Sequence, residues 1–135
     1  MNILVIDGQG GKIGQQLVKA VKDHLPEAEL LAIGTNSIAT SNMIKAGAEN
    51  AATGENAVIA GCRYADIIVG PIGIVIADSL FGEVSPAMAS AVGQSRAEKI
   101  LIPVNKCRHT IVGVTETSIT VLIRQAIEAV KKAGR

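Results

Sequence analysis

The stretch from Asn2 to Val18, NILVIDGQGGKIGQQLV, constrains the fold more than any other part of the chain. A short apolar run, typical of a buried strand, ends at Asp7, and an amphipathic helix follows it. Between the two, Gly8, Gly11 and Gly14 form a G-x-x-G-x-x-G pattern, whose small residues allow a tight turn and a close approach of a phosphate to the backbone. The N–H groups at the helix start would then face an anion. The turn therefore predicts a phosphate-bearing nucleotide or cofactor as ligand.

The length and hydropathy of the chain limit the kind of protein that can contain this turn. A chain of 135 residues predicts one domain, residues 1–135, with a single core. Hydrophobic residues make up 48% and the mean hydropathy is +0.37, yet no apolar run approaches the roughly 18 residues that cross a bilayer. The segment Ile3–Ile6 lacks a basic flank and precedes Asp7, which indicates a strand and not a signal peptide. With Cys62 and Cys107 as free thiols, we expect a cytoplasmic protein without membrane contact.

Charge and aromatic content argue against a nucleic-acid partner. The net charge is +1, the basic residues are scattered, and Tyr64 and Phe81 are the aromatic residues. Single-stranded nucleic acids are typically bound by basic grooves with stacking rings, which this composition does not supply. No spacing of His, Cys and carboxylates resembles a metal site.

The rest of the chain alternates apolar runs typical of strands with stretches typical of helices. After the first strand, further strands are predicted at Glu29–Ile33, Glu49–Ala52, Asp66–Val69, Lys99–Ile102 and Thr110–Val114. Helices are predicted from Ile13 to Leu25, from the turn 34–37 to about Gly47, from Thr53 or Gly54 to about Arg63, from Ser85 to Gly93, and from Thr117 to Lys132. The periodicity of Ile74–Leu80 does not separate helix from strand.

Strands separated by helices imply right-handed crossovers between parallel strands. We therefore predict a single Rossmann-like or flavodoxin-like three-layer α/β domain with a mostly parallel sheet of about five to six strands. Ligands in such folds bind at the carboxyl ends of the strands. Four turns would converge there, and the predicted cofactor-binding residues are Asp7, Gly8, Gln9, Gly10, Gly11, Lys12, Ile13 and Gly14, then Thr35, Asn36 and Ser37, then Gly70, Pro71 and Gly73, and finally Asn105, Lys106 and Arg108.

Three of these turns also have a purely structural interpretation. The glycine turn is alternatively only a tight connection between the first strand and the first helix, with no role in phosphate binding. The second strand ends without the Asp or Glu that holds a ribose diol, so Thr35 and Asn36 suit the 2′-phosphate of NADP or a mononucleotide phosphate, and they serve equally as a helix cap. The cluster 105–109 suits anion binding or acid–base chemistry, or is a solvated loop. Within it, Cys107 is either an activated thiol or a spectator, and no catalytic residue is assigned.

Three resemblances add to this interpretation. GQGGKIGQQLV at 8–18 resembles the pyridine-nucleotide loop of dihydrodipicolinate reductase. The layout of ADIIVGPIGIVIADSLFGE at 65–83 and KILIPVN at 99–105 is similar to the cysteine-decarboxylase class of flavoproteins. The resemblance places the Pro-containing loop of that class at Pro71 and its Pro-x-Asn motif at Pro103 and Asn105, and it implies a contact of Thr35 with a flavin phosphate. Over its whole length, with the blocks IDGQGG, GTN, TGEN, GPIGI and IPVN, the chain resembles a family of small bacterial proteins classed only as a domain of unknown function. That resemblance implies a Rossmann-like fold and no activity.

Two classes of function stay open. The first is a nucleotide-binding module with a sensing or regulatory role, which holds an NAD(P)-type ligand in the Gly8–Gly14 loop without chemistry. The second is a small FMN- or NAD(P)-dependent enzyme that completes its active site across an oligomer interface. The apolar segment Ile72–Phe81 exceeds what a small core needs, and it predicts a homodimer or homotrimer with this segment at the interface.

Overall fold

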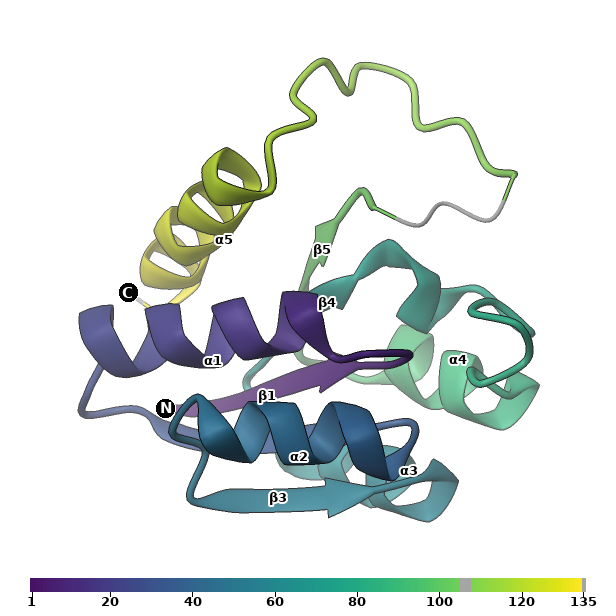
Figure 1. The fold of residues 1–135 in the computed structure, drawn as a ribbon, viewed down its shortest axis with the longest axis horizontal. Coiled ribbons are helices and arrows are strands. Elements are labelled where there is room, and N and C mark those ends of the chain that lie inside the picture. Colours follow the sequence, from purple (N-terminus) through teal and green to yellow (C-terminus); the bar gives the residue numbers. More distant parts are fainter. Residues whose placement is uncertain (105–107, 135) are drawn as a thin grey trace.

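The computed structural model describes residues 1–104 and 108–134 as a single α/β domain (Figure 1). Strands and helices alternate along the chain, as the patterns predict. The elements are β1 (Asn2–Asp7), α1 (Lys12–His24), β2 (Glu29–Gly34), α2 (Ser37–Lys45), β3 (Asn50–Thr53), α3 (Glu55–Tyr64), β4 (Ile67–Pro71), the 3-10 helix η1 (Ile72–Val75), α4 (Pro86–Gln94), β5 (Glu98–Ile102) and α5 (Ile119–Ala133).

The five strands form one parallel sheet in the order β3-β2-β1-β4-β5. This is the strand order of the Rossmann fold, and it reverses direction between β1 and β4. The register pairs Asp7 with Gly34 and Gly34 with Thr53, so the carboxyl ends of β1, β2 and β3 lie level. The turns after these strands, including the glycine loop, therefore share one edge of the sheet.

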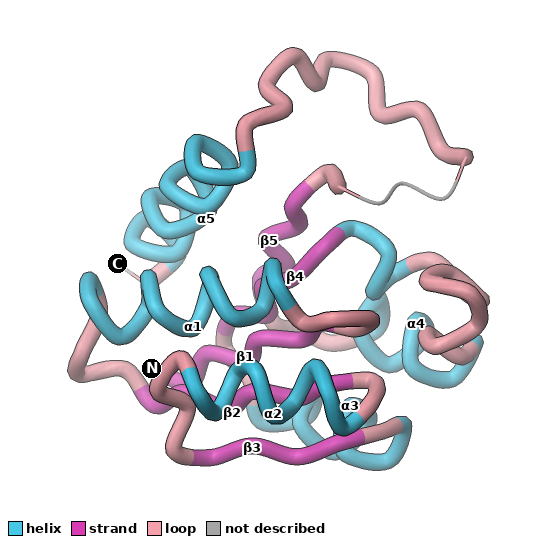
Figure 2. Tube along the Cα trace, viewed as in Figure 1, coloured by secondary structure: helices cyan, strands magenta, loops and turns pink. Residues whose placement is uncertain are grey.

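Helices cover both faces of the sheet, as Figure 2 shows with the helices in cyan around the magenta strands. On one face, Ile3 and Val5 of β1 pack with buried residues of α1, α2 and α5. On the other face, Leu4 and Ile6 pack with α3, α4 and the chain after β4. This alternation follows from the pleat of a strand buried on both sides. No helix of the described part of the chain is long and apolar enough to span a membrane.

Polar residues cap the helices where the sequence pattern places helix starts. The Asn36 Oδ1 atom accepts from the backbone N–H of Ala39 at 2.9 Å and caps α2. The Ser85 Oγ atom accepts from the Met88 N–H at 3.1 Å, and Pro86 occupies the first turn of α4. Both caps satisfy N–H groups that a helix cannot pair internally. The predicted helix starts at 34–37 and 85–86 are confirmed.

The predicted sixth strand at Thr110–Val114 is wrong. Residues 108–118 form turns and irregular loop that stand off from the sheet between β5 and α5 (Figure 1). Its β-branched sequence has strand propensity, but a strand also needs a neighbour to pair with, and propensity alone does not supply one. The ambiguous segment Ile74–Leu80 is neither a regular strand nor an α-helix: η1 ends at Val75 and turns follow.

The apolar segment Ile72–Phe81 is only partly available for an interface. Ile74 is 1% exposed and Leu80 is 3% exposed, because both pack into the core cluster with α3 and α4, so the expected exposure is wrong for these two side chains. Phe81 is 99% exposed, and Ala77 is exposed as well. The remaining apolar side chains of the segment, at 72, 75 and 76, are partly buried.

Candidate functional site

The glycine loop between β1 and α1 is shaped by close packing as well as by the turn. The Gly11 N–H donates to the Gly8 carbonyl at 2.9 Å, and Gly11 has a φ of 72° in the left-handed region. A Cβ on Gly11 would lie 2.6 Å from the Cα of Ala39 in α2, and one on Gly14 would lie 2.6 Å from the Met43 Sδ. These two glycines therefore let α1 approach α2, whereas a Cβ on Gly10 would meet nothing within 4 Å.

The Asp7 side chain occupies the start of α1. It is 4% exposed, and its carboxylate accepts from the Gly8 N–H at 2.8 Å through Oδ1 and from the Gly14 N–H at 2.7 Å through Oδ2. Burial raises the pKa of the Asp7 carboxyl above its ordinary value, and the nearby Glu83 carboxylate adds to the rise, although the two N–H groups favour the charged form. The Asp7 carboxylate therefore satisfies the Gly14 N–H in the first turn of α1, and this N–H group is then not available to a phosphate.

A second carboxylate, Glu83, lies in the turn ahead of α4 and reaches across to the glycine loop. Its Oε1 atom accepts three hydrogen bonds: from the Gln9 N–H at 2.8 Å, from the Thr35 hydroxyl at 2.7 Å and from the Asn36 side-chain amide at 2.7 Å. Burial alone would raise the pKa of Glu83, but these three donors outweigh it and hold the pKa below its ordinary value. Glu83 is thus held as an anion by the donors that sequence analysis assigned to a ligand.

Thr35 and Asn36 lie directly after β2 and bind the glycine loop as well as Glu83. The Thr35 N–H donates to the Asp7 carbonyl at 2.9 Å, and the Asn36 amide also donates to the Gln9 carbonyl at 2.9 Å. The glycine loop and the turn after β2 therefore meet, and their donors converge on the Glu83 Oε1 atom. Ser37 begins α2 and is exposed.

The third predicted turn, at 70–73, is buried beneath the chain that follows it. A Cβ on Gly70 would lie 2.3 Å from the Ile6 carbonyl oxygen, so glycine is needed for β4 to lie against β1. The Ser79 hydroxyl donates to the Gly73 carbonyl, and Leu80 packs close to Gly8 and Gly73. Pro71 ends β4 and is buried. This turn contacts the 76–84 chain in the structure.

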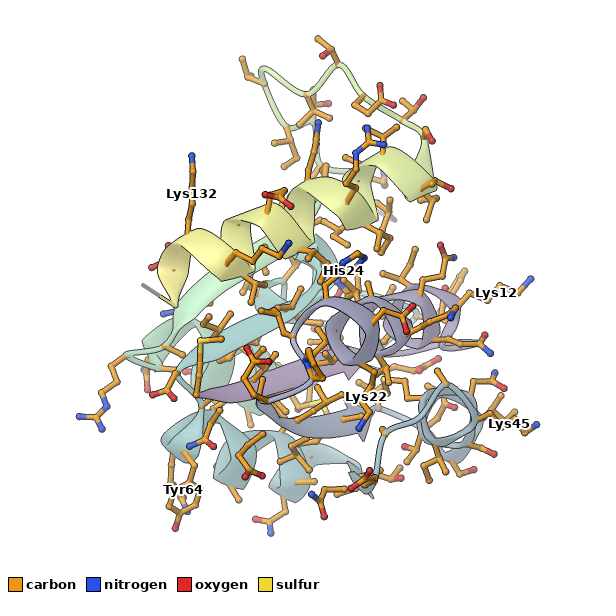
Figure 3. The ribbon with its side chains drawn as sticks, turned by 90° about the vertical axis from the view of Figure 1, so that its left-hand side faces the viewer. Lys12, Lys22, His24, Lys45, Tyr64 and Lys132 are labelled. Atoms are coloured by element: carbon orange, nitrogen blue, oxygen red, sulfur yellow. The ribbon has the colours of Figure 1, made fainter. Side chains whose placement is uncertain are left out.

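The fourth predicted turn is described only in part. Asn105, Lys106 and Cys107 lie outside the described residues. Arg108 and His109 are exposed in the loop before α5. Lys12, the first residue of α1, is also exposed, and Figure 3 shows Lys12, Lys45 and Lys132 extending outward from three different helices.

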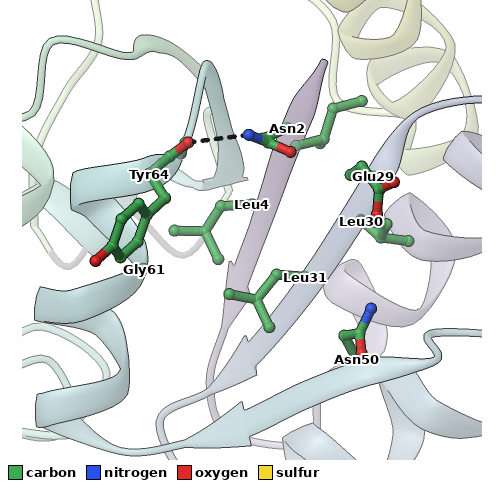
Figure 4. Close-up of a pocket in the computed structure, with 10 residues that line it drawn as sticks. Asn2, Leu4, Glu29, Leu30, Leu31, Asn50, Gly61 and Tyr64 are labelled. Atoms are coloured by element: carbon green, nitrogen blue, oxygen red, sulfur yellow. Dashed lines mark hydrogen bonds between the residues drawn. The ribbon is translucent and has the colours of Figure 1, made fainter.

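A hollow of about 290 Å³ lies at the opposite edge of the sheet, at the amino ends of β1, β2 and β3 (Figure 4). Leu4, Leu31 and Tyr64 line it, and the Asn2 side-chain amide donates to the Tyr64 carbonyl at 3.4 Å. It does not include any residue of the glycine loop. Within the described ranges, no group of three or more His, Cys, Asp or Glu side chains is placed to hold a metal ion.

Glu83 was not predicted as a site residue, although Gln9, Thr35 and Asn36, which bind it, were. The local signal was weak, because Glu83 is one of two acidic residues, with Asp78, in a largely apolar segment. Which donors that carboxylate meets depends on contacts across 74 residues of chain, from Gln9 to Glu83. Asp7 was predicted as a ligand contact, whereas the structure has the Asp7 carboxylate bonded to the loop itself.

Fold and site together define a single-domain Rossmann-like α/β protein with a glycine loop at the carboxyl edge of a five-stranded parallel sheet. The chain belongs to the family described as Domain of unknown function (DUF3842), whose model matches residues 2–135. No curated protein matches this chain.

Three solved structures are similar to this chain over almost all of its length. A dodecameric FMN-dependent UbiX-like decarboxylase from Escherichia coli O157:H7 is 16% identical with a TM-score of 0.48, over 98% of this chain and 76% of that one. A Rossmann-fold NAD(P)-binding family protein from Shigella flexneri is 15% identical with a TM-score of 0.49, over 99% and 63%. A nucleoside-diphosphate-sugar epimerase from Pseudomonas aeruginosa is 12% identical with a TM-score of 0.49, over 97% and 48%.

Proposed function

We propose that this protein binds a phosphate-bearing nucleotide at the edge of the sheet formed by the glycine loop and the turn after β2. One observation carries the proposal: the Gln9 N–H, the Thr35 hydroxyl and the Asn36 amide converge on a single carboxylate oxygen at 2.7–2.8 Å. Three donors that meet on one oxygen form a site for an oxyanion, whether it belongs to a carboxylate or to a phosphate.

The chemistry of the donors supports a nucleotide cofactor over a bare ion. All three donors are neutral, so they position an oxygen without neutralising a full phosphate charge, and the remaining affinity would come from the rest of a larger ligand. Ligands of this size bind at the carboxyl edge of Rossmann-like sheets. We therefore propose an NAD(P)-type ligand, with FMN as the alternative.

The proposed role is sensing or regulation. The carboxylates of Asp7 and Glu83 lie at the glycine loop, and both already accept hydrogen bonds from it. Such groups position the loop, whereas a general base needs to reach a proton on the substrate. The enzyme alternative would draw its missing groups from a second copy, and Phe81 and Val112, exposed at 99% and 95%, are surfaces for that association.

Calorimetric titration with NAD, NADP, FMN and ATP tests the proposal. Thr35→Val removes one donor while keeping the shape of the side chain. Because Thr35 also binds Glu83 in the ligand-free protein, the replacement is made in a Glu83→Ala background, where we expect it to weaken binding of the ligand about tenfold. Thr120→Val makes the same replacement at an exposed position of α5 and should leave the affinity unchanged in that background. Binding that is equally strong in Glu83→Ala with and without Thr35→Val would remove Thr35 from the site and contradict the proposal.

A further inference from the structure

The donors proposed to hold a ligand oxygen are fully used by the protein itself. The Gln9 N–H and the Thr35 hydroxyl each supply one proton, and both go to the Glu83 Oε1 atom. The Asn36 amide supplies two protons, one to Glu83 and one to the Gln9 carbonyl. A phosphate oxygen cannot share these donors with Glu83, so the carboxylate and a ligand exclude each other.

Charge adds to this exclusion. The Asp7 carboxylate lies close enough to Glu83 for the two to interact, and both accept hydrogen bonds from the glycine loop. A phosphate entering beside an ionised Glu83 would place a second negative group next to it, in a partly buried position where repulsion is screened less than at the surface. Binding with Glu83 in place is therefore disfavoured twice, by lost donors and by repulsion.

The chain that carries Glu83 is a compact turn with several hydrogen bonds of its own. We call Ile76–Ser85 the latch segment. Within it, the Asp78 N–H donates to the Val84 carbonyl at 2.7 Å, the Gly82 N–H to the Asp78 carbonyl at 3.1 Å and the Val84 N–H to the Ser79 carbonyl at 3.2 Å. Its ends stay anchored, because the Ile76 N–H and the Ser79 hydroxyl donate to the Gly73 carbonyl and Ser85 caps α4, so the part that moves is the tip with the Glu83 side chain.

The latch segment is also held in an unfavourable conformation. Asp78, Leu80 and Phe81 have φ values of 64°, 56° and 57°, a left-handed region that residues with a side chain rarely adopt. Phe81 at its tip is 99% exposed. Contacts elsewhere must offset this strain, and the Glu83 hydrogen bonds together with the burial of Leu80 and Val84 are the contacts that do so.

We infer that the latch segment is an internal gate, in which the Glu83 carboxylate occupies the ligand-oxygen position of the glycine loop and leaves it when a phosphate ligand binds. The inference rests on the proposed function, because it needs a ligand for the same donors. The affinity of the ligand is then reduced by the fraction of molecules in which the gate is open. Weakening the latch raises that fraction and tightens binding.

Glu83→Gln tests the gate because it keeps the shape of the side chain and removes the charge. A neutral acceptor forms weaker bonds to the three donors, so we expect NADP, or FMN as the alternative ligand, to bind about tenfold more tightly to the variant, with inorganic phosphate as the minimal probe. Glu128→Gln on α5 removes the same charge from an exposed position and should leave the affinity unchanged. An affinity that stays the same or falls in Glu83→Gln would overturn the gate, and a fall would make Glu83 a ligand contact.

Hydrogen exchange gives a second readout. In ligand-free protein, the peptide 76–85 should exchange faster in Glu83→Gln than in the parent. Adding FMN to the parent should slow exchange in the peptide 8–14 and accelerate it in the peptide 76–85, as the latch leaves. Protection of both peptides would contradict the gate while keeping the proposed function. If none of the four nucleotides or phosphate binds either the parent or Glu83→Gln, both proposals fail.

Discussion

Replacing Gly11 by alanine should separate the structural role of the glycine loop from its proposed binding role. Gly11 has a φ of 72°, and an added Cβ would lie 2.6 Å from the Ala39 Cα and 2.9 Å from the Ala39 carbonyl oxygen. Both contacts are with backbone, so they cannot be relieved by rotating a side chain. The N-terminus of α1 must instead move away from α2, which disturbs packing that involves Gly14 and Met43.

The expected cost follows from two contributions. The left-handed conformation costs a residue with a Cβ about 1–2 kcal/mol relative to glycine. Overpacking against neighbours that cannot move adds roughly 1–3 kcal/mol. Gly11→Ala should therefore lower the free energy of unfolding by about 2–5 kcal/mol, a large part of the roughly 5–15 kcal/mol typical of a domain.

Urea unfolding followed by circular dichroism measures this loss, and Gly10→Ala is the matched control. Gly10 lies outside the left-handed region and a Cβ there would meet nothing within 4 Å, so the free energy of unfolding of Gly10→Ala should stay within about 0.5 kcal/mol of the parent value. Equal stability of Gly11→Ala and the parent would refute the close packing of α1 on α2.

Three further predictions concern the chain after β4 and the two carboxylates. Leu80→Ala should cost about 2–5 kcal/mol because Leu80 is buried, whereas Phe81→Ala should change stability by no more than about 0.5 kcal/mol, both measured by urea unfolding. If the exposed ring mediates association, light scattering should give the parent at least twice the 13.9 kDa chain mass, and Phe81→Ala should lower that mass. Because the pKa of Glu83 is lowered, its stabilisation is present above the ordinary value of 4.5 and is lost as the pH falls through the folded-state pKa. The stability difference between the parent and Glu83→Gln should therefore shrink in acid. Asp7 has the opposite sign: because its pKa is raised, the parent gains stability relative to Asp7→Asn as the pH falls through that pKa toward 3.8.

Most of the fold could be predicted because its signals are local. Apolar runs of four or five residues marked the strands, and Asn36, Ser85 and Pro86 marked helix starts through side-chain caps and a fixed φ. The segment Thr110–Val114 shows where such signals fail. Its residues favour a strand, but whether a strand forms depends on a pairing partner, which no local pattern contains.

The location of the candidate site could be predicted from the sequence, but not what its hydrogen-bond donors bind. The convergence of the glycine loop with Thr35 and Asn36 follows from parallel strands ending at one edge, and the structure brings these residues together. That these donors bind Glu83 could not be predicted, because its position beside them depends on how the chain 76–85 folds. The roles of individual glycines could not be predicted either, because they depend on how the helices pack. In the folded protein, a Cβ on Gly11 would collide with Ala39, whereas a Cβ on Gly10 would meet nothing within 4 Å.

The central claim, that the glycine loop and the turn after β2 form the ligand site, is tested most directly by mapping where a nucleotide binds. Amide NMR spectra of 15N-labelled protein should be recorded while FMN or NADP is added. We expect shifts at the amides of Gly8–Gly14, Thr35 and Asn36, and at the latch segment as it moves. Shifts confined to the opposite edge, around Asn2 and Tyr64, or no shifts with either nucleotide, would contradict it.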